Sequence, residues 1–137
     1  TLKTRLGFAE NNKNIRTVAK MAEQAGIAAL AVHGRTREQM YKGQASYDLI
    51  GEVKHDISIP LWVNGDITTP QKAAEVLRQT GADGVMIGRG AQGRPWLFAD
   101  IAYFLQHGSP SAPVAFQTAS ARQKTTGRPN TPCPPVP

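Results

Sequence analysis

The chain has almost no cysteine: Cys133 is the only one among 137 residues, and it lies in a proline-rich C-terminal stretch. One cysteine cannot form an intrachain disulfide framework. The pairs of closely spaced cysteines found in many structural zinc sites are missing as well. We therefore expect neither disulfide bonds nor a metal site.

Long hydrophobic runs are also missing. The longest mostly apolar run covers residues 25–32, far short of the ~20 residues that a membrane-spanning helix needs. The first residues lack the basic and then apolar layout of a secretory signal peptide. These features predict a cytoplasmic protein with no membrane partner.

Acidic residues are outnumbered, with 10 Asp and Glu against 16 Lys and Arg and a formal net charge of +6. Three of the basic residues lie beyond residue 108, so the preceding part of the chain is only mildly basic. This balance is compatible with nucleic acid or a phosphorylated cofactor, and equally with an ordinary solvated surface.

Short apolar runs alternate with helical segments up to about residue 106. This order is typical of strand–helix units around a parallel sheet. Four units correspond to half of an eight-stranded TIM barrel, so we expect an α/β fold of that class. The predicted strands are 2–6, 28–33, 60–64 and 84–87, and the predicted helices are about 14–24, 47–55, 70–81 and 95–105.

The composition changes after residue 107. Residues 108–137 contain seven of the ten prolines and many small polar residues, which is typical of disordered segments. We expect a partial barrel domain over residues 1–107 and a disordered tail over 108–137. The outer strands of a half-barrel would be open edges, which predicts low stability, self-association or pairing with a complementing chain.

Two glycine turns each follow an apolar strand. The first is Asn64-Gly65-Asp66, and the second begins at Gly88-Arg89. Taken alone, the first turn fits a tight turn with an Asp helix cap. Together the turns also fit a phosphate site, because glycine lets backbone N–H groups approach an anion and an arginine can bind it.

Four other polar residues lie near predicted strands. Lys3 is near the start of the first strand, where a solvated lysine is common, and His33 ends the second strand, where a structural hydrogen bond is common. Arg35 and Arg37 follow on a long loop, residues 34–46, that we expect to be exposed. Arginine binds phosphate in a bidentate manner, so these two are candidate RNA contacts as well as ordinary surface residues.

The chain resembles the tRNA-dihydrouridine synthases, in particular the B-type enzymes, through four segments in the order and spacing of that family. They are Thr1–Gly7, Val32–Arg37, Asn64–Ile67 and Gly88–Trp96. The resemblance implies strands five to eight of an FMN-binding TIM barrel. The implied parent activity is the reduction of uridine in tRNA to 5,6-dihydrouridine, with NADPH as the reductant of FMN.

The resemblance also implies roles for individual residues. Lys3 and His33 are expected to contact FMN, and the two turns are expected to hold its phosphate through Asn64, Gly65, Asp66, Gly88 and Arg89. Arg35 and Arg37 are the candidate substrate contacts. The family's proton-donating cysteine would lie upstream of Thr1, and Cys133 matches no family motif. We therefore expect no catalytic residue in this chain and little or no activity of the chain alone.

Two alternatives stay open at this point. One is another FMN-dependent barrel, such as a dihydroorotate-dehydrogenase-like enzyme, with a phosphate site after its last two strands. The other is a half-barrel that binds phosphate or FMN, or associates with itself, without turnover.

Overall fold

Strands and helices alternate along the chain in the computed structural model, which describes residues 1–110. In chain order the elements are β1 (Leu2–Arg5), α1 (Ile15–Gln24), β2 (Leu30–His33), α2 (Asp48–Asp56), β3 (Leu61–Asn64), α3 (Pro70–Thr80), β4 (Gly84–Met86), the short 3-10 helix η1 (Arg89–Ala91) and α4 (Leu97–His107). The four predicted strand–helix units are confirmed. Most of the predicted disordered tail, from residue 111 onward, lies outside the described residues.

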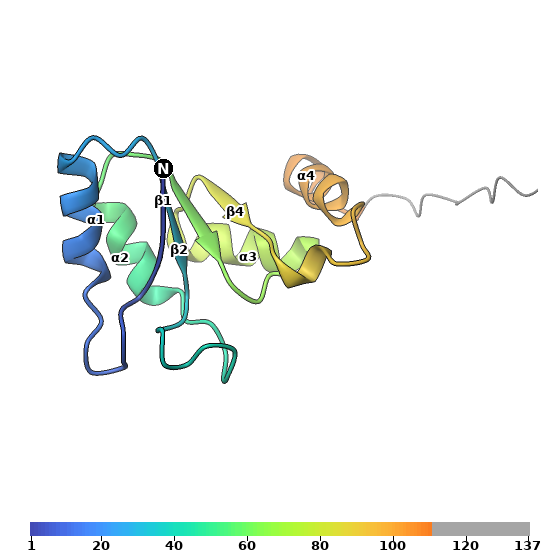
Figure 1. Cartoon of the computed structure of the whole chain (residues 1–137). Coiled ribbons are helices and arrows are strands. Elements are labelled where there is room, and N and C mark those ends of the chain that lie inside the picture. The colour runs from blue at the N-terminus through green and yellow to red at the C-terminus, as the bar shows by residue number, and fades with distance from the viewer. Residues whose placement is uncertain (111–137) are drawn as a thin grey trace, which may run out of the picture.

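The four strands form one parallel sheet in the order β1-β2-β3-β4. The register aligns Arg5 with His33, His33 with Asn64 and Asn64 with Met86. The C-terminal ends of the strands therefore meet at one edge of the sheet, the lower edge in Figure 1. Because open parallel sheets bind ligands outside these ends, this edge is where a site is expected.

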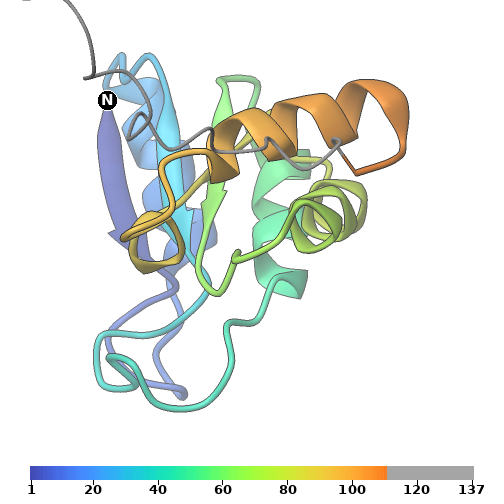
Figure 2. The same cartoon turned by 90° about the vertical axis from the view of Figure 1, so that its right-hand side faces the viewer.

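One face of the sheet is covered by helices. Alternate residues of a strand point to opposite faces, so Leu30 and Val32 of β2 are fully buried toward the helices while His33 lies on the other face. Figures 1 and 2 show α1, α2 and α3 along the covered face, with α4 packed against α3. The largest fully buried apolar side chains of this core are Leu6, Ile15, Leu30, Val32, Ile50, Val53, Leu61, Val63, Val76 and Leu97.

Local signals explain the ends of α3. The Thr69 hydroxyl accepts a hydrogen bond from the Lys72 N–H (3.1 Å), so Thr69 and not Asp66 is the N-cap of α3. Pro70 occupies the first turn, where its missing N–H costs nothing. Gly81 ends the helix with φ at 65°, a left-handed conformation that suits glycine.

The largest difference from the predicted boundaries is at α4. The sequence predicts a helix over 95–105, whereas α4 spans Leu97–His107. Residues 94–97 form a separate turn, closed by a hydrogen bond from the Leu97 N–H to the Arg94 carbonyl (3.0 Å). At the other end, Gly108 adopts a φ of 70° and stops the helix two residues later than predicted.

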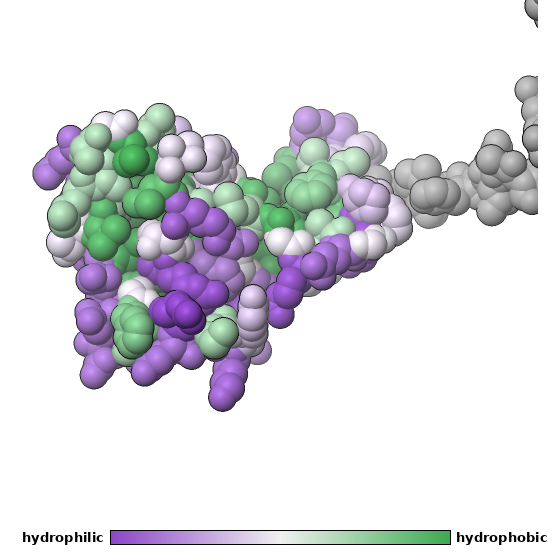
Figure 3. Space-filling view, viewed as in Figure 1, coloured by the Kyte–Doolittle hydropathy of each residue, from purple (hydrophilic) through white to green (hydrophobic). Residues whose placement is uncertain are grey.

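The other face of the sheet is open, with no helix from residues 1–110 covering it. Figure 3 views this face, where hydrophobic residues gather toward the N-terminal ends of the strands and hydrophilic residues toward the C-terminal ends. Within the described part of the chain, β1 and β4 each pair with a single strand. No helix in this part is long and apolar enough to cross a membrane.

Candidate functional site

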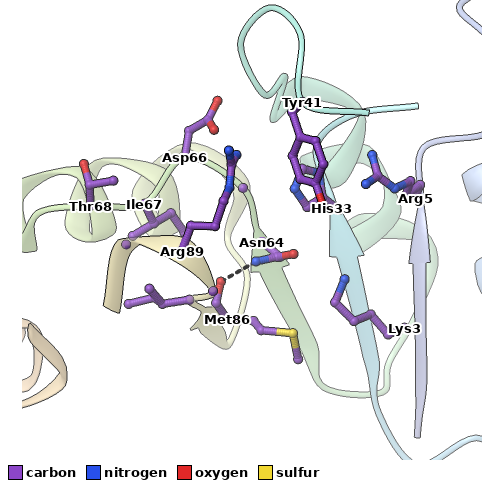
Figure 4. Close-up of a pocket in the computed structure, with 14 residues that line it drawn as sticks. Lys3, Arg5, His33, Tyr41, Asn64, Asp66, Ile67, Thr68, Met86 and Arg89 are labelled. Carbon is purple, nitrogen blue, oxygen red and sulfur yellow. Dashed lines mark hydrogen bonds between the residues drawn. The ribbon is translucent and has the colours of Figure 1, made fainter. Parts of the chain in front are cut away.

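Polar side chains converge on the open face at the C-terminal ends of the strands. Lys3 and Arg5 of β1 are two residues apart and so point to the same side of the sheet. The sheet register places Arg5 beside His33 of β2, and His33 beside Asn64 of β3. Figure 4 shows these side chains directed into one cavity.

The cavity has a volume of about 350 Å³ and is bounded by β1 to β4 and by the turns that follow β3 and β4. Its lining residues are Lys3, Arg5, His33, Tyr41, Asn64, Gly65, Asp66, Ile67, Thr68, Met86, Ile87, Gly88, Arg89 and Gly90. All seven residues predicted to bind the cofactor are therefore brought together around one cavity. Arg35 and Arg37 do not line it.

His33 is the most perturbed titratable group of the cavity. Burial and the positive charges of Arg5, Lys3 and Arg35 lower the pKa of His33 to about 4. The ring is therefore neutral at pH 7. Its Nδ1 atom is buried and has no hydrogen-bond partner, an unusual condition for a buried polar atom. A neutral imidazole with an unused nitrogen can accept or donate a hydrogen bond to a ligand in the cavity.

The first glycine turn is held close to the strand ends. The Asn64 amide donates a hydrogen bond to the Met86 carbonyl (2.6 Å), which ties the end of β3 to β4. Gly65 has a φ of 122°, and a Cβ there would lie 2.9 Å from Ala45 Cβ and 3.3 Å from the His33 ring. Only glycine fits this backbone conformation beside its neighbours. Asp66 also adopts a positive φ of 51°.

Arg35 is buried, contrary to the prediction of an exposed loop. Its side chain is 3% exposed and makes a bidentate pair with the Asp66 carboxylate, with N–O distances of 2.9 and 2.8 Å. It also donates to the carbonyls of Lys42 and Gly43. The physical reason is that the loop folds back over the β3 turn, and burying the guanidinium requires a carboxylate and carbonyl acceptors around it.

The same contacts hold Asp66. Burial raises the pKa of Asp66, but hydrogen bonds from Arg35 and from the Ala45 N–H (2.8 Å) outweigh it, so the net pKa lies below its ordinary value. The carboxylate is therefore ionised at pH 7 and engaged on the protein side. Because Arg35 neutralises its charge, Asp66 repels an anion in the cavity less than an unpaired carboxylate would. Asp66 contributes to the turn through its backbone.

Tyr47 stabilises the first glycine turn through a hydrogen bond to its backbone. Its hydroxyl donates a hydrogen bond of 2.7 Å to the Gly65 carbonyl. Burial and the nearby Asp66 carboxylate raise the pKa of Tyr47 to about 12, so the hydroxyl keeps its proton and stays a donor. No pattern in the sequence indicates this contact, since Tyr47 is expected there only as the first residue of a helix.

The second glycine turn packs against the first. A Cβ at Gly90 would lie 2.5 Å from the Ile67 carbonyl oxygen, whereas a Cβ at Gly88 would meet nothing within 4 Å. Gly90 thus permits the close packing of the two turns, and Gly88 leaves open space on the cavity side. The Arg89 guanidinium reaches over the cavity to the Tyr41 ring, 4.6 Å from its centroid (Figure 4).

Seven of the 14 lining residues are not among the predicted cofactor residues. Of these seven, Arg5 and Gly90 could have been found in the sequence, and Tyr41 could not. Arg5 is at i+2 from Lys3, so the strand period of two places it on the same face. Gly90 lies two residues after Gly88 in the same glycine-rich turn. Tyr41 lies within the long loop, where no periodicity indicates which side chain faces the cavity.

The fold and the cavity define a class: a parallel α/β domain with two glycine turns and unpaired cationic groups at the strand ends. The family model described as "Dihydrouridine synthase (Dus)" matches residues 1–127. The chain belongs to this family, whose members are oxidoreductases that process tRNA, and the family resemblance found in the sequence is confirmed.

Curated relatives agree with this assignment. The chain is 59% identical over 108 residues to the tRNA-dihydrouridine synthase B of Pseudomonas putida, covering 79% of the chain and 32% of the relative. It is 56% identical over 117 residues to the enzyme of that name from Vibrio cholerae, covering 84% of the chain and 36% of the relative. The chain therefore spans about a third of the length of these relatives.

Proposed function

We propose that this chain supplies the phosphate-binding and ring-contacting part of the FMN site of a tRNA-dihydrouridine synthase, corresponding to strands five to eight of its TIM barrel. The observation that carries the proposal is the single cavity at the ends of four parallel strands, lined by both glycine turns, Lys3 and His33. Phosphate sites of such barrels lie after the last two strands, which would be β3 and β4.

The residues of the cavity fit a flavin mononucleotide. The dianionic phosphate needs backbone N–H groups and a cation, which the open side of Gly88 and the Arg89 guanidinium offer. The ring system needs polar partners, and His33 Nδ1 is buried without one. The one acidic side chain of the lining, Asp66, is already paired with Arg35.

Each residue has a distinct role in this proposal. The Lys3 ammonium has no partner among the described residues and would stabilise negative charge on the pyrimidine side of the ring. His33, neutral at pH 7, would fix the ring by a hydrogen bond without adding charge. Bound FMN, once reduced, would supply the hydride that reduces uracil to 5,6-dihydrouracil, and NADPH is the proposed reductant of the flavin.

The proton for the second carbon of the uracil needs an acid, and we assign that role to a residue outside this chain. Cys133, the single cysteine, lies outside the family motifs. Acid catalysis typically contributes ~10²–10⁴-fold to a rate, so the chain alone is expected to have little or no activity. Arg37, exposed at the strand-end face, remains the better candidate RNA contact, whereas Arg35 acts inside the protein.

A chimera tests this proposal without requiring the chain to act alone. Residues 1–105 replace the matching segment of the Vibrio cholerae relative, and tRNA from cells that lack the native enzyme is analysed for dihydrouridine. The expected result is dihydrouridine in the presence of the chimera, and its loss in the chimera carrying Lys3→Ala. A folded, flavin-loaded chimera that forms no dihydrouridine would contradict the proposal.

The family assignment favours this activity over oxidation of dihydroorotate, the alternative raised by the sequence. The self-association alternative has separate support, because β1 and β4 each pair with one strand in the part of the chain that the structure describes. Gel filtration of the purified chain tests it. A discrete dimer would support mutual completion of two half-barrels, and a monodisperse monomer would exclude it.

A further inference from the structure

A second cavity lies beside the first and shares Arg5 with it. Its volume is also about 350 Å³, within the range of small-ligand sites, roughly 300–1,000 Å³. It is lined by Thr4, Arg5, Gly7, Phe8, Asn14 and Arg37. Apart from Arg37, no candidate site residue of the sequence lies here, and the proposed FMN site leaves this cavity unused.

Two loops build this cavity, and backbone hydrogen bonds hold them together. The loop after β1 and the loop after β2 run side by side below the sheet in Figures 1 and 2. The Leu6 N–H donates to the Arg35 carbonyl (3.3 Å), the Arg37 N–H to the Gly7 carbonyl (2.9 Å) and the Glu38 N–H to the Phe8 carbonyl (2.9 Å). These hydrogen bonds hold Phe8 and Arg37 on two adjacent loop segments.

The two side chains are available to a ligand. Phe8 is 63% exposed, so its ring is accessible to a ligand. Arg37 is exposed, and its guanidinium makes no hydrogen bond or ion pair within residues 1–110. Exposed aromatic rings and unpaired cations at one place are the combination that binds single-stranded nucleic acid, through base stacking and phosphate contacts.

The charged side chains that line the cavity, Arg5 and Arg37, favour an anion. No acidic residue lines the cavity. Glu10 on the loop after β1 is paired with Lys13, so its charge is compensated. Arg5 donates to the carbonyls of Thr36 (2.9 Å) and Met40 (3.2 Å), which holds its positive charge at the boundary between the two cavities. Asn14 caps α1 without a side-chain hydrogen bond, so its amide can meet a base edge.

From these observations we propose that the second cavity binds a nucleotide of single-stranded RNA next to the uridine in the first cavity, with its base stacked on Phe8 and a phosphate on Arg37. This inference rests on the proposed function, which places the target uridine in the adjoining cavity. It adds a recognition site for a flanking nucleotide, shared between the loops after β1 and β2.

The test titrates fluorescein-labelled hexauridylate with the purified full chain and follows fluorescence anisotropy at low salt. Phe8→Ala should weaken binding roughly 5- to 100-fold, since that is the effect of losing one stacked base. Arg37→Gln should weaken binding and lower the salt slope by about 0.7, since it removes one phosphate contact to a single strand. Matched controls are Phe98→Ala on α4 and Arg78→Gln on α3, both exposed and distant from the cavity.

Two comparisons isolate the stacking contact. The unsubstituted chain should bind hexauridylate more tightly than an abasic ribose-phosphate oligomer of equal length, and Phe8→Ala should remove that preference. Phe8→Trp should retain it, whereas Phe8→Leu should not, because leucine keeps the apolar volume without a ring face. This pair keeps the test decisive even if Phe8→Ala lowers the melting temperature.

Three results would overturn the proposal: no binding of hexauridylate, no preference over the abasic oligomer, or equal weakening by the control variants. A separate FMN titration of the same chain distinguishes this failure from failure of the proposed function. A chain that binds FMN but not hexauridylate loses only the nucleotide site. A chain that binds hexauridylate through Phe8 and Arg37 but does not bind FMN keeps the RNA site and loses the flavin assignment.

Discussion

Arg35 and Asp66, 31 residues apart in sequence, form a partly buried bidentate ion pair that joins the loop after β2 to the glycine turn after β3. Arg35 is 3% exposed, and Asp66 also accepts the Ala45 N–H. The pair therefore sets the position of the turn that we assign to the FMN phosphate. Arg35 is a positioning residue for this turn and has no free guanidinium for RNA.

Asp66→Asn should lower the free energy of unfolding by about 3 kcal/mol, because it leaves the buried Arg35 charge without its counter-ion. Urea unfolding at pH 7 measures the change. The matched control is Glu75→Gln, which removes a carboxylate from an exposed pair with Lys72. The control should cost less than about 1 kcal/mol. Equal losses in the two variants would show that the Arg35–Asp66 pair is not desolvated as the structure indicates.

The His33 ring should titrate at about pH 4, well below the ordinary 6.5. A proton-NMR titration of the ring measures this midpoint. Arg5→Gln should raise it, because the positive charge of Arg5 is one of its causes. A midpoint near 6.5 in the unsubstituted chain would contradict the burial of His33 beside three cationic groups.

The free energy of unfolding should also depend on the titration of His33. Between pH 6.5 and about 4 the unfolded chain binds a proton on His33 that the folded chain does not, so the free energy of unfolding should fall as the pH falls through this window. Unfolding in urea at pH 7 and pH 5 checks the direction. His33→Asn should show a smaller decrease between the two pH values, since the asparagine does not titrate.

The same substitution at two glycines should have opposite effects. Gly90→Ala would place a Cβ 2.5 Å from the Ile67 carbonyl, which forces the two turns apart and should reduce both stability and FMN affinity. Gly51→Ala in α2 meets its nearest neighbour at 3.6 Å and should stabilise the chain by about 0.5–1 kcal/mol, because alanine favours helix. Thermal melts of both variants measure this contrast, and destabilisation by Gly51→Ala would show that α2 has no room for the methyl group.

Much of the fold follows from patterns that are local in sequence. Branched apolar runs ended by glycine mark the strands, and Thr69, Pro70 and Gly81 mark α3. Lys3 lies near the start of β1, and only the strand period of two places it on the same face as Arg5. The other six predicted cofactor residues are at the C-terminal ends of strands or in the turns that follow them, so a parallel sheet necessarily brings these six to one edge. Their meeting at one cavity therefore follows from the order of strands and turns along the chain.

The features of the site that the sequence does not predict depend on the fold of the long loop, residues 34–46. Its return over the β3 turn buries Arg35 and brings Tyr41 to the cavity, and no periodic pattern in residues 34–46 indicates either outcome. The arrangement that sets Phe8 beside Arg37 is likewise made of backbone hydrogen bonds between two loops. Backbone contacts of this kind leave no signature in side-chain types.

The most direct test of the phosphate site compares FMN with riboflavin, which lacks the phosphate, by flavin fluorescence quenching in the purified chain. FMN should bind roughly 10- to 100-fold more tightly, the effect of one or two charge-assisted hydrogen bonds. Arg89→Gln should reduce this preference without changing riboflavin affinity, and Arg78→Gln should change neither. Equal affinity for the two flavins, or no binding at high micromolar FMN, would contradict the assignment of the two glycine turns to a flavin phosphate.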